Sequence, residues 1–351
     1  MNILMVSYNP YGMLGTSGTY NLSEAYAKKS NFTLLCNSSS KINQVYKKSN
    51  NFDIIEKPQN KYFNAICEIV QKKKIKVIIF TVSILFLRLI PQVKNKFKDI
   101  KCVLDLKSPR LSDKRNNNSF NKKTSKIQKQ IDLIITPSFD NIETWITNYK
   151  GKYFIYDLGI NLEDFEIMNF TNKEHCKKFV YIGQIHPKRE IMSLLNHINN
   201  IPRKIRDNCV FDFYGDGHIK NKVQRFCKNK SYVNFKGLLP QKKLFKVLST
   251  YDVGLTWIPK KLYTNSPSLK FIEYMAAGVY PIATDTKLHI SYQQHFDFKI
   301  FNDERTFTET IVNLYNNGIK KEGLERNYNS IQKYDWNCIC DNILGELSKW
   351  K

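Results

Sequence analysis

Short apolar runs alternate with longer stretches of mixed polarity along most of the chain. Each run has the length of a buried strand, and the stretches between runs leave room for helices. In the first half the runs are MNILMVS (1–7), FTLLCN (32–37), VIIFT (77–81), CVLDL (102–106), LIITPS (133–138) and YFIYDLGI (153–160). In the second half they are KFVYIGQ (178–184), VFDFYGD (210–216), VNFKG (233–237), VGLTWI (253–258) and YPIAT (280–284). This alternation predicts parallel sheets covered by helices on both faces.

The two series of runs predict two similar domains. We expect an N-terminal Rossmann-like domain over residues 1–165 and a second over 166–330. Segment 331–351 should form a C-terminal helix that packs back toward the N-terminal domain. Ligands of doubly wound sheets bind outside the carboxyl ends of the strands. The predicted fold class is therefore α/β, with two doubly wound Rossmann-like domains facing across a ligand-binding cleft.

The segment SPSLKFIEYMAAGVYPIATD (266–285) combines helix signals with a following strand. Ser266 is a candidate N-cap, Pro267 suits the first helical position, and Gly278 suits the residue that ends a helix. The free N–H groups at such a helix start favour an anion. Glu273 lies about 9 Å further along the helix, at roughly 1.5 Å per residue, where it could accept hydrogen bonds from hydroxyl groups. The alternative is a core helix with one solvent-facing glutamate.

Composition adds a strong positive charge to this picture. The 351 residues carry 55 Lys and Arg against 31 Asp and Glu, a formal net charge of +24. This excess favours anionic partners, although lysine is spread along the chain and diffuse surface charge is an equal alternative. The eight cysteines form no CxxC pair, which favours reduced thiols in the cytoplasm. The most apolar run, 77–90, contains Arg88 and is too short to span a membrane.

Several second-half motifs have a recognisable order and spacing. These are YIGQIHPKRE, FDFYGDGHIKNKV, VNFKGLLPQKKLFKVLSTYDVGL and SPSLKFIEYMAAGVYPIAT, preceded by the linker-like YDLGINLEDF. Together they resemble the retaining glycosyltransferases of the GT-B fold, glycosyltransferase family 4 (group 1). The first-half runs VLDLK and IDLIITPS look like the acceptor-domain strands of that family, so the resemblance covers nearly the whole chain.

The resemblance implies transfer of a hexose from a UDP- or GDP-linked sugar to a glycan or lipid-linked acceptor, with retention of anomeric configuration. It implies no metal and no cofactor beyond the nucleotide-sugar co-substrate. Lys188 or Arg189 would hold the diphosphate, and Glu273 the ribose hydroxyls. The residues implied for catalysis are Arg189, Lys188, Glu273 and Asp105. Those implied for donor binding are Gly12, Gly15, Gly18, Gly183, Gln184, Gly215, Gly217, Asn265, Ser266, Ser268, Leu269, Lys270 and Glu273.

Three departures from the family pattern change what we expect of the site. Gln184 stands where relatives often have an arginine, and Asn265 stands where they have a first glutamate. Many relatives also carry a first-domain histidine near the sugar, whereas all six histidines here lie at position 175 or later. The matching segment is DLKSPR, so Asp105, Lys107 and Arg110 are candidate replacements. For Asp105, a role in capping the strand end is an equal alternative.

Two other function classes remain open at this stage. A sugar-nucleotide epimerase of the same fold would need a carboxylate and histidine set in the first domain, which the missing histidines weaken. A basic, non-catalytic nucleic-acid-binding protein would fit the charge, but its lysines are not interleaved with aromatic residues as in a binding module. We therefore expect no nucleic acid partner. The favoured hypothesis is a cytoplasmic transferase in cell-surface polysaccharide or glycoconjugate synthesis, with an anionic inner membrane face as a further candidate partner.

Overall fold

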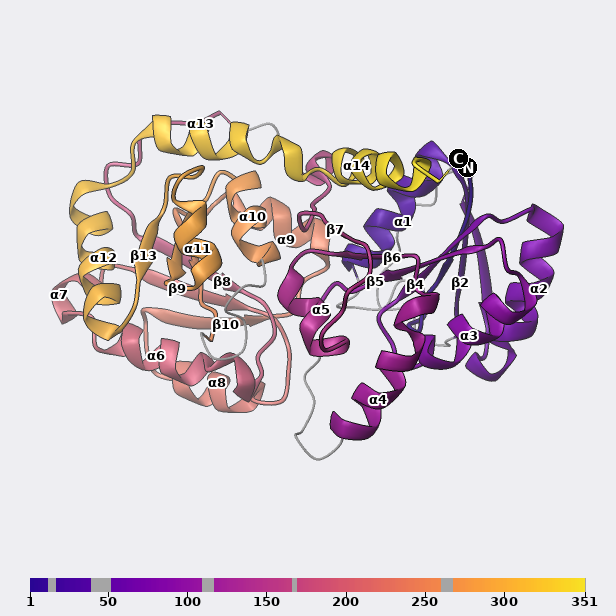
Figure 1. Cartoon of the computed structure of the whole chain (residues 1–351). Coiled ribbons are helices and arrows are strands. Elements are labelled where there is room, and N and C mark those ends of the chain that lie inside the picture. Colours follow the sequence, from indigo (N-terminus) through magenta and orange to yellow (C-terminus); the bar gives the residue numbers. More distant parts are fainter. Residues whose placement is uncertain (12–16, 39–51, 109–116, 166–168, 260–267, 351) are drawn as a thin grey trace. The chain divides into compact units, whose positions relative to one another are not determined.

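The computed structural model describes residues 1–11, 17–38, 52–108, 117–165, 169–259 and 268–350. These residues divide into two compact units (Figure 1). Unit 1 contains Met1–Gly159 together with Trp336–Lys351, and unit 2 contains Ile160–Asp335. Each unit is an α/β structure built on one parallel sheet, which confirms the predicted fold class.

The described residues of unit 1 form a seven-stranded parallel sheet in the order β3-β2-β1-β4-β5-β6-β7. Its strands are β1 (Asn2–Val6), β2 (Asn31–Asn37), β3 (Phe52–Lys57), β4 (Val77–Thr81), β5 (Lys101–Asp105), β6 (Leu133–Thr136) and β7 (Tyr153–Ile155). The direction of winding reverses between β1 and β4. Open α/β sheets bind ligands outside the carboxyl ends of the strands near such a reversal.

Helices cover both faces of this sheet because successive strand residues point to opposite sides. Leu4 and Val6 of β1 belong to one core, while Ile3 and Met5 belong to the other. The first core lies under α2 (Tyr62–Lys73), α3 (Phe86–Lys96) and α5 (Phe139–Trp145), and α4 (Asn117–Ile127) packs on α3. The second core lies under α1 (Ser17–Lys29) and α14 (Trp336–Ser348).

Helix α14 completes unit 1 from the other end of the described chain. It packs along α1, and Figure 1 shows the two helices, yellow and indigo, beside each other. Trp336, Ile339 and Ile343 are buried in the core that also contains Ile3 and Met5. A Cβ atom on Gly159 would lie 2.5 Å from the Trp336 ring, so this glycine admits the indole.

Unit 2 repeats the plan with a six-stranded parallel sheet among its described residues, in the order β10-β9-β8-β11-β12-β13. Its strands are β8 (Lys178–Ile182), β9 (Val210–Tyr214), β10 (Val233–Gly237), β11 (Val253–Thr256), β12 (Tyr280–Thr284) and β13 (Lys299–Phe301). Here the winding reverses between β8 and β11. The carboxyl ends of these two strands are therefore the expected ligand-binding position in unit 2.

The helices of unit 2 again lie on both faces of the sheet. They are α6 (Ile191–Asn199), α7 (Arg203–Arg206), α8 (Lys220–Cys227), α9 (Gln241–Leu248), α10 (Leu269–Ala276), α11 (Lys287–Tyr292), α12 (Glu304–Asn317) and α13 (Lys321–Ser330). Phe179 and Tyr181 of β8 face the core beneath α6, α8 and α12, whereas Val180 and Ile182 face the core beneath α9 and α10. Helix α12 begins at a reciprocal capping box between Asp303 and Thr306.

The cysteines of the chain are free thiols. All eight cysteines lie in the described residues, and none is in a disulfide. Burial raises the pKa of several of these thiols, including Cys102 to about 12. Within the described ranges, no helix combines the length and the apolar character needed to cross a membrane.

Candidate functional site

Two glycine-containing turns lie side by side at the carboxyl ends of β8 and β9. The Gly183 N–H donates to the Tyr214 carbonyl at 3.0 Å, and the Ile185 N–H donates to the Asp216 carbonyl at 2.9 Å. Gly183, Gly215 and Gly217 have φ angles of +142°, +149° and +152°, which favour glycine. A Cβ on Gly215 would lie 1.8 Å from the Gly183 carbonyl oxygen. The two turns therefore pack backbone against backbone with no room for a side chain.

A short 3₁₀ turn, Pro187–Arg189, follows the first of these glycine turns and presents Lys188 and Arg189. His186 caps it, since its Nδ1 accepts the Lys188 N–H at 3.2 Å. Trp257, which directly follows β11, donates its indole Nε1–H to the Arg189 carbonyl at 3.1 Å. The buried indole stacks on Phe301 and so has a fixed orientation. Sequence reasoning missed Trp257, because it has the character of an ordinary core residue.

Helix α10 begins at Leu269, with Ser268 in the N-cap position. The sequence predicts a start two residues earlier, with Ser266 as the cap and Pro267 in the first helical position, but both residues lie outside the described ranges. Ser268, whose backbone is extended, directly precedes the helix. The Ser268 side chain makes no capping hydrogen bond. Gly278, with φ +68°, ends the helix as predicted.

Tyr274 holds α10 against the central strands of unit 2. Its hydroxyl accepts the Ile182 N–H at 3.0 Å and donates to the Val180 carbonyl at 3.2 Å, both in β8. Its ring packs where a side chain at Gly254 of β11 would stand, since a Cβ there would lie 2.3 Å from the ring. The start of α10 is therefore positioned beside the carboxyl end of β8.

Lys270 and Glu273 are partly buried on α10, and the pKa values of both side chains are strongly shifted. The Lys270 Nζ lies 4.2 Å from the centre of the Tyr181 ring, and a Cβ on Gly183 would lie 3.2 Å from it. Burial, helped by the positive charge of Arg189, lowers the pKa of Lys270 to about 7. Burial also raises the pKa of Glu273 to about 7, against the opposing effect of Lys270. A negative ligand beside Lys270 and Arg189 would relieve their mutual repulsion.

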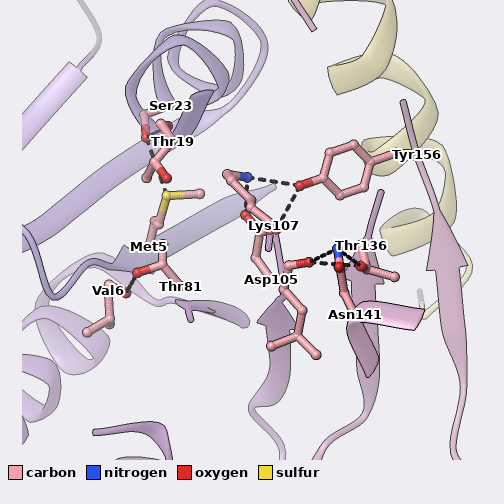
Figure 2. Close-up of polar contacts among 11 residues, drawn as sticks. Met5, Val6, Thr19, Ser23, Thr81, Asp105, Lys107, Thr136, Asn141 and Tyr156 are labelled. Carbon is pink, nitrogen blue, oxygen red and sulfur yellow. Dashed lines mark hydrogen bonds and ion pairs between the residues drawn. The ribbon is translucent and has the colours of Figure 1, made fainter. Parts of the chain in front are cut away.

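Unit 1 contains a buried polar cluster at the carboxyl end of β5 (Figure 2). Asp105 is fully buried, and its Oδ1 accepts the Tyr156 hydroxyl at 2.8 Å. Lys107 forms an ion pair with Oδ2 and donates to the Tyr156 hydroxyl at 3.0 Å. Burial, together with the negative charge of Asp105, raises the pKa of Tyr156 well above its usual value. Tyr156 is therefore a neutral phenol that donates to the carboxylate.

The residues predicted for catalysis and donor binding fall into three groups. Unit 2 brings together the β8 and β9 turns, the cationic turn and the first turn and a half of α10. Asp105 and Gly18 lie in unit 1. Gly18 was expected in a glycine-rich loop, but it lies in the first turn of α1, close to Trp336. Gly12, Gly15, Arg110, Asn265 and Ser266 lie outside the described residues. The residues assembled in unit 2 are Gly183, Gln184, Lys188, Arg189, Gly215, Gly217, Ser268, Leu269, Lys270 and Glu273.

Comparison with known proteins gives a family match for part of the chain. Residues 176–317, all of them in unit 2, match the family model described as glycosyl transferases group 1. No curated protein sequence matches the chain significantly.

Solved structures match the fold over the full length. HepE of Anabaena in complex with UDP and glucose aligns with TM-score 0.74 at 11% identity, over 99% of both chains. Sucrose-phosphate synthase of Thermosynechococcus elongatus aligns with TM-score 0.75 at 15% identity, over 99% of this chain and 98% of that one. The trehalose-6-phosphate protein of E. coli bound with UDP-2-fluoro glucose aligns with TM-score 0.72 at 10% identity, over 99% of each. The chain, with its two α/β units, thus has the GT-B fold.

Proposed function

We propose that this chain, which carries a glycosyl transferases group 1 domain at residues 176–317 within a GT-B fold, transfers a hexose from a nucleotide-sugar donor to a glycan or lipid-linked acceptor. The observation that carries the proposal is the meeting of Lys270, Arg189 and the start of α10 beside the Gly183 turn, with Glu273 one turn further along. This arrangement offers cations and N–H donors to a diphosphate, and a carboxylate to hydroxyl groups. HepE and the E. coli protein, which hold UDP or a UDP-sugar, support a UDP-linked donor.

The chemistry follows from where charge develops during transfer. A departing nucleoside diphosphate gains negative charge, and fixed cations and helix N–H groups lower the barrier by stabilising that charge. Arg189 and Lys270 would contact the phosphates together with Lys188, and the backbone at Ser268 and Leu269 would add donors. Glu273, once ionised, would accept hydrogen bonds from two ribose hydroxyls. These cations would supply the positive charge without a metal, which favours a metal-independent reaction.

Retention of anomeric configuration and a role in cell-surface polysaccharide or glycoconjugate synthesis complete the proposal. Both rest on the resemblance of the second-half motifs to retaining group 1 enzymes.

The net charge of +24 further favours peripheral attachment to an anionic membrane face, where lipid-linked acceptors would be found. Co-sedimentation with vesicles tests that part: binding to anionic vesicles should fall steeply with salt, and equal binding to neutral vesicles would contradict it.

A screen of sugar nucleotides for thermal stabilisation tests the donor site. UDP-glucose or GDP-mannose, at a hundred times its dissociation constant, should stabilise the folded chain by about 2.7 kcal/mol in buffer containing EDTA. The Arg189→Ala variant should lose most of this stabilisation, because it removes one of the cations that would contact the diphosphate. Stabilisation that requires added Mg²⁺ or Mn²⁺ would contradict metal independence. The absence of any stabilisation or donor hydrolysis would contradict the donor site itself.

Binding of UDP at pH 8 should also take up a proton at Lys270. The pKa of about 7 means that Lys270 is mostly neutral at pH 8 in the free chain, with roughly one amine in ten protonated. A bound diphosphate favours the charged amine and raises its pKa, so the complex holds about one proton more. Calorimetry in two buffers of different ionisation enthalpy measures this uptake. It should fall by about one proton in Lys270→Gln and persist in Lys287→Gln, an exposed lysine on α11; equal uptake in both would contradict the assignment.

A further inference from the structure

Lys107 lies at the ligand-binding edge of the unit 1 sheet. It follows β5, whose last residue, Asp105, pairs in register with Thr81 of β4. The Thr81 hydroxyl donates to the Val6 carbonyl at the end of β1 at 3.2 Å, so these three strand ends are neighbours (Figure 2). The winding of the sheet reverses between β1 and β4. Lys107 is therefore one strand away from the position where such sheets bind ligands.

The backbone on both sides of Lys107 is fixed by hydrogen bonds from two other elements. Leu106 is held through both its N–H and its carbonyl, and Ser108 is held through its carbonyl. The bonds are Leu106 N–H to the Ile135 carbonyl (2.9 Å), Thr136 Oγ1–H to the Leu106 carbonyl (2.8 Å), Asn141 Nδ2–H to the same carbonyl (3.2 Å) and Trp145 Nε1–H to the Ser108 carbonyl (2.9 Å). With Asp105 and Tyr156 fixing the side chain as well, Lys107 is held in one geometry.

Only Lys107 in this cluster can reach a ligand. Asp105 is fully buried and uses one oxygen for Tyr156 and the other for Lys107. The Lys107 side chain is 15% exposed, and its ammonium has three N–H donors. Two of them go to Asp105 and Tyr156, and the third finds no acceptor among the residues that the structure describes. Burying an ion pair is seldom more stabilising than an apolar replacement, so stability alone does not explain the cluster.

We propose that Lys107 donates its remaining N–H to a hydroxyl oxygen of a sugar substrate, and that Asp105 and Tyr156 are positioning residues that hold the ammonium for this contact. The inference rests on the proposed sugar transfer and assigns the sugar-facing residue of unit 1. It gives Asp105, whose two carboxylate oxygens are used by Tyr156 and Lys107, a positioning role in place of the expected catalytic one.

The charge of the cluster favours an uncharged oxygen over a phosphate. Asp105 balances the charge of Lys107, so a phosphate would meet a pair with no net charge. A hydroxyl oxygen needs only one oriented donor, which is what the cluster offers. Around Lys270 the charges do not cancel, because two cations, Lys270 and Arg189, accompany one carboxylate, that of Glu273. The two lysines are thus suited to different parts of a nucleotide sugar and its acceptor.

The Lys107→Met variant removes the donors while keeping most of the side-chain length. A hydrogen bond from a charged donor contributes enough that kcat/KM should fall about 10- to 150-fold. Affinity for UDP alone, measured by calorimetry, should stay within about twofold, because no phosphate contact is lost. Lys152→Met, at an exposed position of the same unit, is the matched control and should keep parental kinetics.

Two assays on the full chain distinguish whether the hydroxyl belongs to donor or acceptor. The first measures UDP released from UDP-glucose with water alone, and the second measures transfer to p-nitrophenyl glucosides. A loss in both assays assigns the hydroxyl to the donor sugar, and a loss in the second alone assigns it to the acceptor. Parental kcat/KM in both assays would overturn the proposal, as would a fall in UDP affinity that matches the fall in turnover.

A double-mutant cycle tests the positioning role of Tyr156. Tyr156→Phe keeps the ring but removes the acceptor for Lys107 and the donor to Asp105, and we expect about a three- to tenfold loss of kcat/KM. The Lys107→Met/Tyr156→Phe double variant should be no worse than Lys107→Met alone, since Tyr156 acts through Lys107. Additive losses would show that Tyr156 does not act through Lys107, and a lower melting temperature with parental kcat/KM would show a purely structural cluster. If the parent binds and turns over no sugar nucleotide, the proposed function fails as a whole; a failure confined to these variants overturns only this inference.

Discussion

Replacing Gly215 with alanine should destabilise unit 2 by more than about 4 kcal/mol, which is exceptional for one methyl group. The new Cβ would stand 1.8 Å from the Gly183 carbonyl oxygen, and the backbone angle of +149° is one that alanine rarely adopts. Neither turn can move cheaply, because the Gly183 N–H is bonded to Tyr214 and the Gly215 N–H to the Gly237 carbonyl at 2.9 Å. Thermal unfolding followed by circular dichroism would show the loss, along with a lower soluble yield.

The matched control for this substitution is Gly237→Ala, at the end of the neighbouring strand β10. Gly237 also has a positive φ, +74°, but a Cβ there would meet nothing within 4 Å. The only cost is the positive φ angle, which is unfavourable for alanine, so we expect a destabilisation of about 1–2 kcal/mol. Equal destabilisation by the two substitutions would show that the close contact between the β8 and β9 turns does not contribute.

Replacing Glu273 with glutamine should lower donor-dependent turnover about 10- to 150-fold while the fold persists. Glutamine keeps the size and one acceptor but removes the charge that strengthens hydrogen bonds to ribose hydroxyls, a loss of about 1.5–3 kcal/mol. The melting temperature at pH 8 should not fall, and it should rise if anything. Burial raises the pKa of Glu273 to about 7, so ionising it at pH 8 opposes folding, and the neutral amide avoids that cost.

Donor hydrolysis and melting temperature, measured together, distinguish a Glu273 that binds the donor from a Glu273 that is a solvent-facing residue of a core helix. Glu322→Gln, at an exposed position in the first turn of α13, is the control and should behave like the parent. Arg189→Ala should be at least as damaging as Glu273→Gln, because it removes positive charge from the departing diphosphate. Near-parental turnover in Glu273→Gln would mean that Glu273 is an ordinary helix residue and that the donor site lies elsewhere.

The alternation of apolar runs was enough to predict the parallel sheets, but it missed two strands. Both are edge strands, β3 at one end of the unit 1 sheet and β13 at one end of the unit 2 sheet. Most residues of β3 are partly or fully exposed, so FDIIEK forms no apolar run, and β13 is only three residues long. Central strands are buried on both faces and leave a clear signal, whereas these two edge strands are too exposed or too short to leave one.

Local spacing also located α10 and Glu273, because capping and helical periodicity are properties of neighbouring residues. It did not reveal Trp257 or Tyr156, whose contacts join residues 68 and 51 positions apart. Both look like core aromatics until the fold brings their polar atoms to Arg189 and Asp105. Lys270 was expected at the donor site without a specific role. Its pKa is lowered by burial and by the positive charge of Arg189, and both depend on the fold, which also brings Tyr181 and Gly183 to the start of α10.

The place of α14 in unit 1 has a consequence for the order in which the chain folds during synthesis. Unit 2 is one continuous stretch, Ile160–Asp335, and all of its contacts are available once Asp335 has left the ribosome. The core of unit 1 is completed later, because residues of α14 pack in it against α1. These residues are Trp336, Ile339, Ile343 and Leu347. Although β1 precedes every strand of unit 2 in the sequence, unit 1 is therefore completed after unit 2. Until α14 emerges, that face of its sheet exposes apolar surface, which is the condition under which nascent chains require chaperones.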